Sequence, residues 1–277
     1  MAKGIGLIGN FRGKVGNMVG YNLKDSNNKQ TQGVRVYQPV VKNPKTYGQA
    51  EQRAKLAPIN ATYRALKAII DRGQEGKAYG NKSRLAWLSD AMKSFNGGWF
   101  DKGEAITLPA WVGLTNGSLP GLNVDSIENG VMNVVCHGVT SASAHATVAD
   151  LTALILADYT GLKAGDQITF VTVRNVSGSL VSIIKSIVLD STDTTALPFT
   201  VTVSADSIGV QIATEGVAAA VIVSREGDNG AHLRSAAALQ PDDSLESDRT
   251  DDASKEAAIK SYMAASANTD WAEESIQ

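Results

Sequence analysis

Residues 13–66 constrain the fold of this chain most, because a glycine-rich segment is followed there by a strand-like pattern and then by a helical one. Apolar residues alternate along the chain from Val15 through Val19 and Tyr21, which predicts a first strand with these side chains on one face. A second strand is expected over 33–41. An isolated two-stranded hairpin is marginally stable, so we expect this one to pack on the following helices or on a neighbouring subunit.

Two helices are predicted after the hairpin. Thr46 and Gln49 have the spacing of a capping box, so the first helix should begin at Tyr47, and Pro58 should kink or break it. The second helix should begin at Ser83. Apolar residues recur every three or four positions in both, which predicts an αα-hairpin. These residues are Leu56, Ile59, Tyr63, Leu66 and Ile70 in the first helix, and Leu85, Leu88, Met92 and Phe95, widened by Trp87 and Ala91, in the second.

The remaining chain has a strand-like period of two and frequent turn signals. Strands are expected over 131–136, 144–149, 166–174, 180–189, 199–204, 208–212 and 217–224. About seven short strands of this kind predict an immunoglobulin-like antiparallel β-sandwich. The expected fold class is therefore α+β, with an acidic C-terminal tail that carries a short helix capped by Ser254. The predicted parts are a basic hairpin and helical module over 1–104, the sandwich over 105–235 and the tail over 236–277.

Charge is distributed unevenly along the 277 residues, although the formal net charge is only −2. Residues 1–104 contain 18 Lys/Arg and 7 Asp/Glu, which gives +11. Residues 105–224 contain 3 Lys/Arg and 9 Asp/Glu, which gives −6. Residues 225–277 contain 5 Lys/Arg and 12 Asp/Glu, which gives −7. Such polarity favours head-to-tail packing between copies, or a basic end that faces nucleic acid.

Several classes of protein are disfavoured by the sequence. The single cysteine, Cys136, excludes an internal disulfide and a multi-cysteine zinc site. The longest apolar runs have seven residues, too few to span a bilayer, and no secretory signal is recognisable. We therefore expect no membrane partner, and we expect the chain to stay in the compartment where it is made.

Catalytic signatures are also missing. Gly4, Gly6 and Gly9 match a dinucleotide fingerprint, but too few residues precede them to form its strand, so an arm or edge strand is the plainer interpretation. Cys136 and His137 are adjacent and would point to opposite faces of a strand. No motif of a hydrolase, metalloprotease or phosphate loop is present. We predict no enzymatic activity, no cofactor, no metal and no small-molecule substrate.

Three sets of residues are candidates for contacts. The expected assembly interface is Gly13, Val15, Gly16, Val19, Gly20, Tyr21, Val34, Val36 and Tyr37. The candidates for nucleic-acid contact are Arg12, Lys14, Lys24, Lys29, Arg35, Lys42, Lys45, Arg53 and Lys55. Tyr262 and Trp271 are candidates for docking of the tail on another surface, and the alternative is that the tail folds back on its own domain or stays disordered.

The segments GKVGNMVGY at 13–21, VRVYQPVVKNPKT at 34–46 and QAEQRAKL at 49–56 resemble an uncharacterised family from Bacteroidetes genomes and their phages. Its members share a glycine-rich hairpin, an N-P-x-T motif and Q-x-x-x-R before a helix. The likeness continues through NGSLP at 116–120 into a β-sandwich and covers most of the chain, but not the acidic tail. The family has no established activity, and the resemblance implies a structural component of a phage particle or prophage.

These observations favour a non-enzymatic bacteriophage virion protein, a minor or accessory capsid, head or tail component. It would assemble as a homo-oligomer and with other virion proteins through its N-terminal module, and it would be located in the virion after assembly in the bacterial cytoplasm. Two alternatives stay open. One is a genome-associated protein whose basic N-terminal region contacts DNA, and the other is an adhesion module that binds a host receptor through the sandwich.

Overall fold

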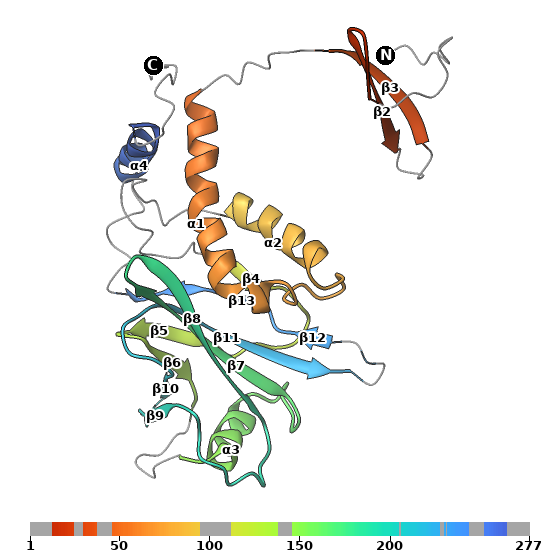
Figure 1. Ribbon diagram of the computed structural model, residues 1–277. Helices are drawn as coiled ribbons and strands as arrows, with labels where there is room; N and C mark the ends of the chain where they lie inside the picture. The colour runs from red at the N-terminus through yellow and green to blue at the C-terminus, as the bar shows by residue number, and fades with distance from the viewer. Residues whose placement is uncertain are drawn as a thin grey trace. The chain divides into compact units, whose positions relative to one another are not determined.

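The computed structural model describes residues 13–24, 30–37, 46–94, 112–137, 146–204, 206–227, 230, 232–243 and 252–264. Over these residues the fold is mixed α+β, as predicted, with four helices and mostly antiparallel sheets (Figure 1). Contacts divide the chain into two units, residues 1–44 and 45–277. The domain limits expected at 104 and 235 remain predictions.

The first unit contains a three-stranded antiparallel sheet. Its strands, in the order β1-β2-β3, are β1 Gly13–Val15, β2 Met18–Lys24 and β3 Gln30–Val36. A tight turn at Gly16 and Asn17 joins β1 to β2, and Gly16 has a left-handed φ of 57°, which a residue without Cβ adopts easily. The single strand expected from Val15 through Tyr21 is therefore wrong, because the chain reverses after Val15.

Helix α1 of the second unit spans Tyr47–Ile70 and begins where the sequence predicts. Its N-cap, Thr46, accepts a hydrogen bond from the backbone N–H of Gln49 at 3.4 Å. The helix does not break at Pro58, and its backbone leaves helical geometry only at Leu66, with φ −113° and ψ 21°. The kink or break expected at Pro58 is wrong, because packing of this buried segment outweighs the lost hydrogen bond and the steric clash that a proline introduces into a helix interior.

Helix α2 spans Asn81–Ser94 and packs on α1. Trp87 is almost fully buried, and its indole Nε1 donates a hydrogen bond to the carbonyl of Gly113 at 2.8 Å. Leu85, which was expected in the apolar stripe, is instead 53% exposed, because the buried face of the helix is centred on Trp87. Phe95 lies outside the described residues.

The β-structure of the second unit consists of two larger sheets and one short ladder. The strands are β4 Gly113–Thr115, β5 Val124–Glu128, β6 Val131–Val135, β7 Gln167–Val176, β8 Ser179–Val188, β9 Thr200–Val203, β10 Ser207–Gln211, β11 Gly216–Glu226, β12 His232–Arg234, β13 Ala237–Ala238 and β14 Gln240–Pro241. One sheet has the order β5-β6-β10-β9, and the other has the order β12-β11-β7-β8 with β14 also paired to β11. β13 pairs with β4.

Six of the seven strands predicted for this region are confirmed, as β6 to β11. The strand expected over 144–149 is wrong, because helix α3, Val148–Asp158, begins within it. Thr147 and Asp150 form a reciprocal capping box at its start, with the backbone N–H of Asp150 3.3 Å from Thr147 Oγ1. This box starts a helix from a run of apolar residues that resembles a strand by composition.

Strands β7 and β11 are buried on both faces. On one face Val171, Val173 and Ile222 share a core cluster with Leu66 and Trp87 of the helices. The opposite face contributes to a second cluster with the four-stranded sheet and α3, through Ile168, Phe170, Ala219, Val221 and Val223. The helices and the four-stranded sheet therefore cover opposite faces of the central strands (Figure 1).

Helix α4, Asp252–Ala264, lies in the C-terminal segment and packs on α1. Ile259 is fully buried in the same cluster as Ala50 and Ala54 of α1. This part of the acidic tail therefore folds back on its own unit. Tyr262 lies in α4, and Trp271 lies outside the described residues.

A buried ion pair ties the end of β11 to the loop before β7. Asp166 is fully buried, and Arg225 holds it through two bonds, Nε to Oδ1 at 2.5 Å and Nη2 to Oδ2 at 2.7 Å. The backbone N–H of Lys163 also donates to Oδ2, at 2.9 Å. Burial by itself would raise the pKa of Asp166, but the hydrogen bonds and charge of Arg225 lower it below its ordinary value.

The ion pair gives a prediction with a defined pH dependence. Because the pKa of Asp166 is lower in the folded than in the unfolded state, its contribution to stability is complete above about pH 5 and declines as the pH falls below about 4. Arg225→Met should therefore lower the free energy of unfolding by about 3–5 kcal/mol at pH 7, since it leaves a buried carboxylate unpaired. Urea unfolding at pH 3 and pH 7 measures this loss, which should be much smaller at pH 3. An equal loss at both values, or an equal loss in Lys93→Met, would contradict the assignment.

The orientation of α2 gives a second prediction. Trp87→Ala should destabilise the chain by about 3–5 kcal/mol, because it removes a large buried side chain and leaves a cavity. Leu85→Ala, two residues away on the exposed face, should change the free energy of unfolding by no more than about 0.5 kcal/mol. Urea unfolding of both variants checks the pair, and similar losses in the two would show that the helix is rotated from the orientation described.

Candidate functional site

The three-stranded sheet of the first unit has two chemically different faces. Cross-strand partners in an antiparallel sheet point to the same face, and Val15 pairs with Met18, which in turn pairs with Val36. Gly13 pairs with Gly20, and Gly20 pairs with Val34. These two rows alternate along the same face, which we call the apolar face: Gly13, Val15, Met18, Gly20, Val34 and Val36.

The four aliphatic side chains of the apolar face are accessible. Val15 is 48% exposed, Met18 38%, Val34 51% and Val36 75%. Gly13 has no side chain and nothing lies within 4 Å of the position that a Cβ would take, so another backbone or an apolar side chain can come close to the sheet there, whereas Gly20 is buried. Large aliphatic side chains gathered in this way on a small sheet are typical of a contact surface.

The opposite face of the same sheet is basic and aromatic. Lys14, Val19 and Arg35 form one cross-strand row on it. The Nζ atom of Lys14 lies 3.5 Å from the centre of the Tyr37 ring, which is the geometry of a cation–π contact. Tyr21 pairs with Gly33, and its ring lies so close that a Cβ at residue 33 would be 2.7 Å from it.

The predicted assembly residues are therefore divided between the two faces. Val19, Tyr21 and Tyr37 lie on the basic face, and Gly16 lies in the turn. Met18 belongs to the apolar face but was missed. The Gly-Asn dipeptide at 16–17, a known hairpin-turn signal, could have revealed this, because a turn there places Met18 opposite Val15.

The candidates for nucleic-acid contact are also separated. Lys14 and Arg35 share the basic face, and Lys24 lies in β2. Arg53 and Lys55 lie in α1 of the other unit, where Lys55 forms an ion pair with Glu51 at 3.0 Å. The remaining candidates, Arg12, Lys29, Lys42 and Lys45, lie outside the described residues.

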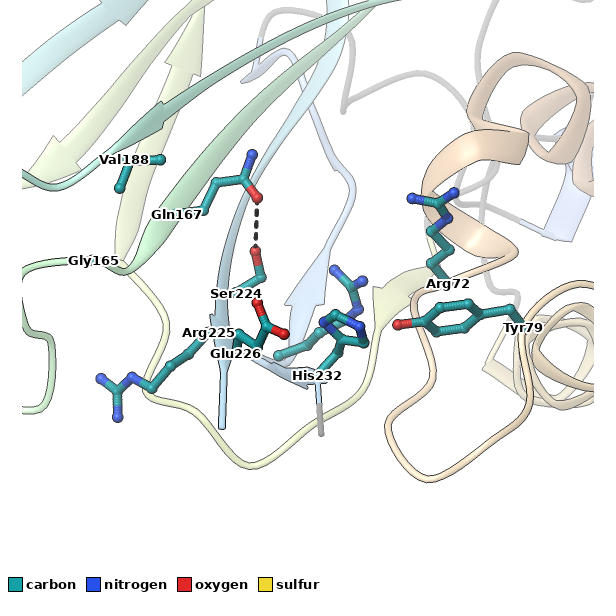
Figure 2. A pocket seen from close by; sticks show the side chains of 10 residues that line it. Arg72, Tyr79, Gly165, Gln167, Val188, Ser224, Arg225, Glu226 and His232 are labelled. Atoms are coloured by element: carbon teal, nitrogen blue, oxygen red, sulfur yellow. Dashed lines mark hydrogen bonds between the residues drawn. The ribbon is translucent and has the colours of Figure 1, made fainter. Parts of the chain in front are cut away.

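A second candidate site is a polar pocket of about 420 Å³ in the second unit. Figure 2 shows Arg72 and Tyr79, from the loop between α1 and α2, on one wall. Gln167, Glu226 and His232, from β7, β11 and β12, lie on the other wall. Sequence reasoning did not find this pocket, because residues more than 150 positions apart form it.

The pocket contains three arginines and one carboxylate. Arg225 is already paired with Asp166, and its side chain points away from Arg72 in Figure 2. Arg72 and Arg234 have neither a side-chain hydrogen bond nor an ion pair within the described part of the chain. Two guanidinium groups are therefore available to a ligand.

The possible metal ligands in the described ranges include Cys136, His137 and His232. There, no three His, Cys, Asp or Glu side chains gather closely enough to hold a metal ion. Cys136 is fully buried, and this burial raises the pKa of its thiol to about 11, so the thiol stays protonated at neutral pH. None of the helices described is both long and apolar enough to cross a membrane.

Comparison with known proteins adds no identification. No protein-family model matches this chain, and searches of curated proteins and of solved structures found no match.

Proposed function

We propose that this chain is a non-enzymatic structural protein of a bacteriophage particle and that it is anchored there through the apolar face of its N-terminal sheet. The observation that carries the proposal is the accessibility of Val15, Met18, Val34 and Val36 on that face. The resemblance of residues 13–56 to a phage-associated family supports the location in a virion. It would be a minor or accessory component of the head or tail.

The small size of the sheet makes exposure of its apolar side chains unfavourable. A small sheet needs a second layer for stability, and burial of an aliphatic side chain contributes about 1.5–3 kcal/mol relative to leaving it exposed. Four such side chains and a glycine row together make a surface whose exposure to water is unfavourable. Docking on another virion protein, or on another copy, removes this exposure.

The second unit would be the projecting part of the protein. Two facing sheets with a shared core support an immunoglobulin-like sandwich as its architecture. Residues 45–277 contain 19 Lys/Arg and 27 Asp/Glu, whereas residues 1–44 contain 7 Lys/Arg and 1 Asp/Glu. The net charges, −8 and +6, favour attraction between the second unit of one copy and the first unit of another.

Incorporation into particles tests the proposal. The wild-type chain should be present in purified phage particles, and Val36→Lys should lower its incorporation by about tenfold or more, because burying a lysine at the contact is costly. Leu85→Lys is the control: Leu85 is an aliphatic residue of the second unit that is also exposed, 53% against 75% for Val36, and this variant should incorporate normally. Quantitative mass spectrometry of purified particles measures the incorporation of the wild type and of the two variants. Absence of the wild-type protein, or equal incorporation of Val36→Lys, rejects the proposal.

A second candidate function is contact with DNA through the basic face, which Lys14, Arg35 and the +6 charge of residues 1–44 favour. If this is correct, binding of duplex DNA should weaken steeply with salt, and the double variant Lys14→Ala, Arg35→Ala should reduce the slope of log K against log salt by about 2. Lys93→Ala should leave the slope unchanged. A filter-binding titration that is flat in salt would count against DNA contact.

A further inference from the structure

We infer that the polar pocket of the second unit binds a small ligand that carries a phosphate or carboxylate group. The pocket presents free guanidinium groups, although residues 45–277 have a net charge of −8. Guanidinium groups bind planar and tetrahedral oxyanions through two parallel N–H bonds, so these are the groups that such a pocket recognises.

Two of the three arginines are available to a ligand. Arg225 lines the pocket, but Asp166 neutralises it, and its Nη2 also donates to the carbonyl of Gly161 at 3.0 Å. Arg72 and Arg234 form no such pairs among the residues described. The excess positive charge of the pocket therefore comes from these two side chains.

Hydrogen bonds hold the backbone of Arg234 and join it to the loop that carries Arg72. The backbone N–H of Arg234 donates to Glu75 at 3.1 Å, and its carbonyl accepts from the N–H of Leu119 at 2.9 Å. Glu75 belongs to the same loop as Arg72 and also accepts two bonds from Ser118, at 2.9 and 2.8 Å. Hydrogen bonding from the backbone of Ser118 lowers the pKa of Glu75, so this link stays ionised at neutral pH. The two walls are thus joined before any ligand arrives, which reduces the entropy lost on binding.

The rings of Tyr79 and His232 set the shape of the site. Their centres are 5.9 Å apart with 37° between the planes, and the guanidinium carbon of Arg72 is 5.8 Å from the Tyr79 ring centre. A pocket of about 420 Å³ is large enough for a small phosphorylated or polycarboxylate molecule.

Glu226 distinguishes the binding of an anion from the binding of a cation. Its residue lines the same pocket and is the cross-strand partner of His232, so its carboxylate repels a bound anion. Glu226→Gln removes that negative charge with little change in shape. It should therefore tighten the binding of an anion, whereas it would weaken the binding of a cation.

Calorimetric titration of the full chain with inorganic phosphate, pyrophosphate and citrate, at one fixed ionic strength, tests the inference. Arg72→Ala and Arg234→Ala should each weaken binding by about tenfold or more, and Glu226→Gln should tighten it by about two- to fivefold. Lys93→Ala removes an exposed charge outside the pocket and should bind like the wild type. A preference for phosphate and pyrophosphate over citrate would identify the phosphate class, and the reverse preference the carboxylate class.

Three results would overturn the inference: no saturable binding of any of the three probes, equal weakening in Lys93→Ala, or weaker binding in Glu226→Gln. Thermal unfolding of each variant without ligand separates a loss of binding from a loss of folding. Because Glu226→Gln is expected to gain affinity, misfolding cannot mimic its result.

Discussion

Burial of β7 and β11 on both faces is the constraint on which the second unit depends. A strand with two apolar faces needs a layer on each side, and here the helices supply one layer and the four-stranded sheet with α3 supplies the other. Ala218, Ala219 and Ala220 of β11 are all buried, and their small side chains let both layers approach the strand closely. The position of α1 and α2 therefore follows from the need to cover this face, and α4 packs on α1.

In the described part of the first unit, the aliphatic side chains of the apolar face stay exposed. Its register gathers Val15, Met18 and Val36 in one row beside a row of glycines, and these valines and Met18 remain accessible. The proposed docking of another molecule on this face would follow the same physical rule that builds the second unit, burial of apolar side chains under a second layer. The polar pocket is shaped by charge and not by apolar burial, and its charged groups lie where β11 leaves the core. There, Asp166 neutralises only one of the arginines.

Local patterns predicted most of the elements. The N-cap at Thr46 and the strands β6 to β11 follow from capping residues and from alternation, which act over a few positions. The errors have the same origin. Composition suggested a strand over 144–149, but the capping box of Thr147 and Asp150 starts a helix there, and Pro58 is tolerated because distant packing holds α1 together. Leu85 could not be distinguished from Trp87, because both fit a helical stripe and only contact with β4 selects the buried one.

The sequence by itself determined the α+β class, the charge polarity and the single unpaired cysteine, since composition and short-range periodicity carry these properties. Only the tertiary structure decided which side chains share a face or a pocket. The two-residue turn between β1 and β2 places Val15 on the same face as Met18. The packing of distant segments places Arg72 and Arg234 in the lining of one pocket. The physical reason is that register and long-range packing depend on contacts between residues far apart in the chain, and no local pattern records those contacts.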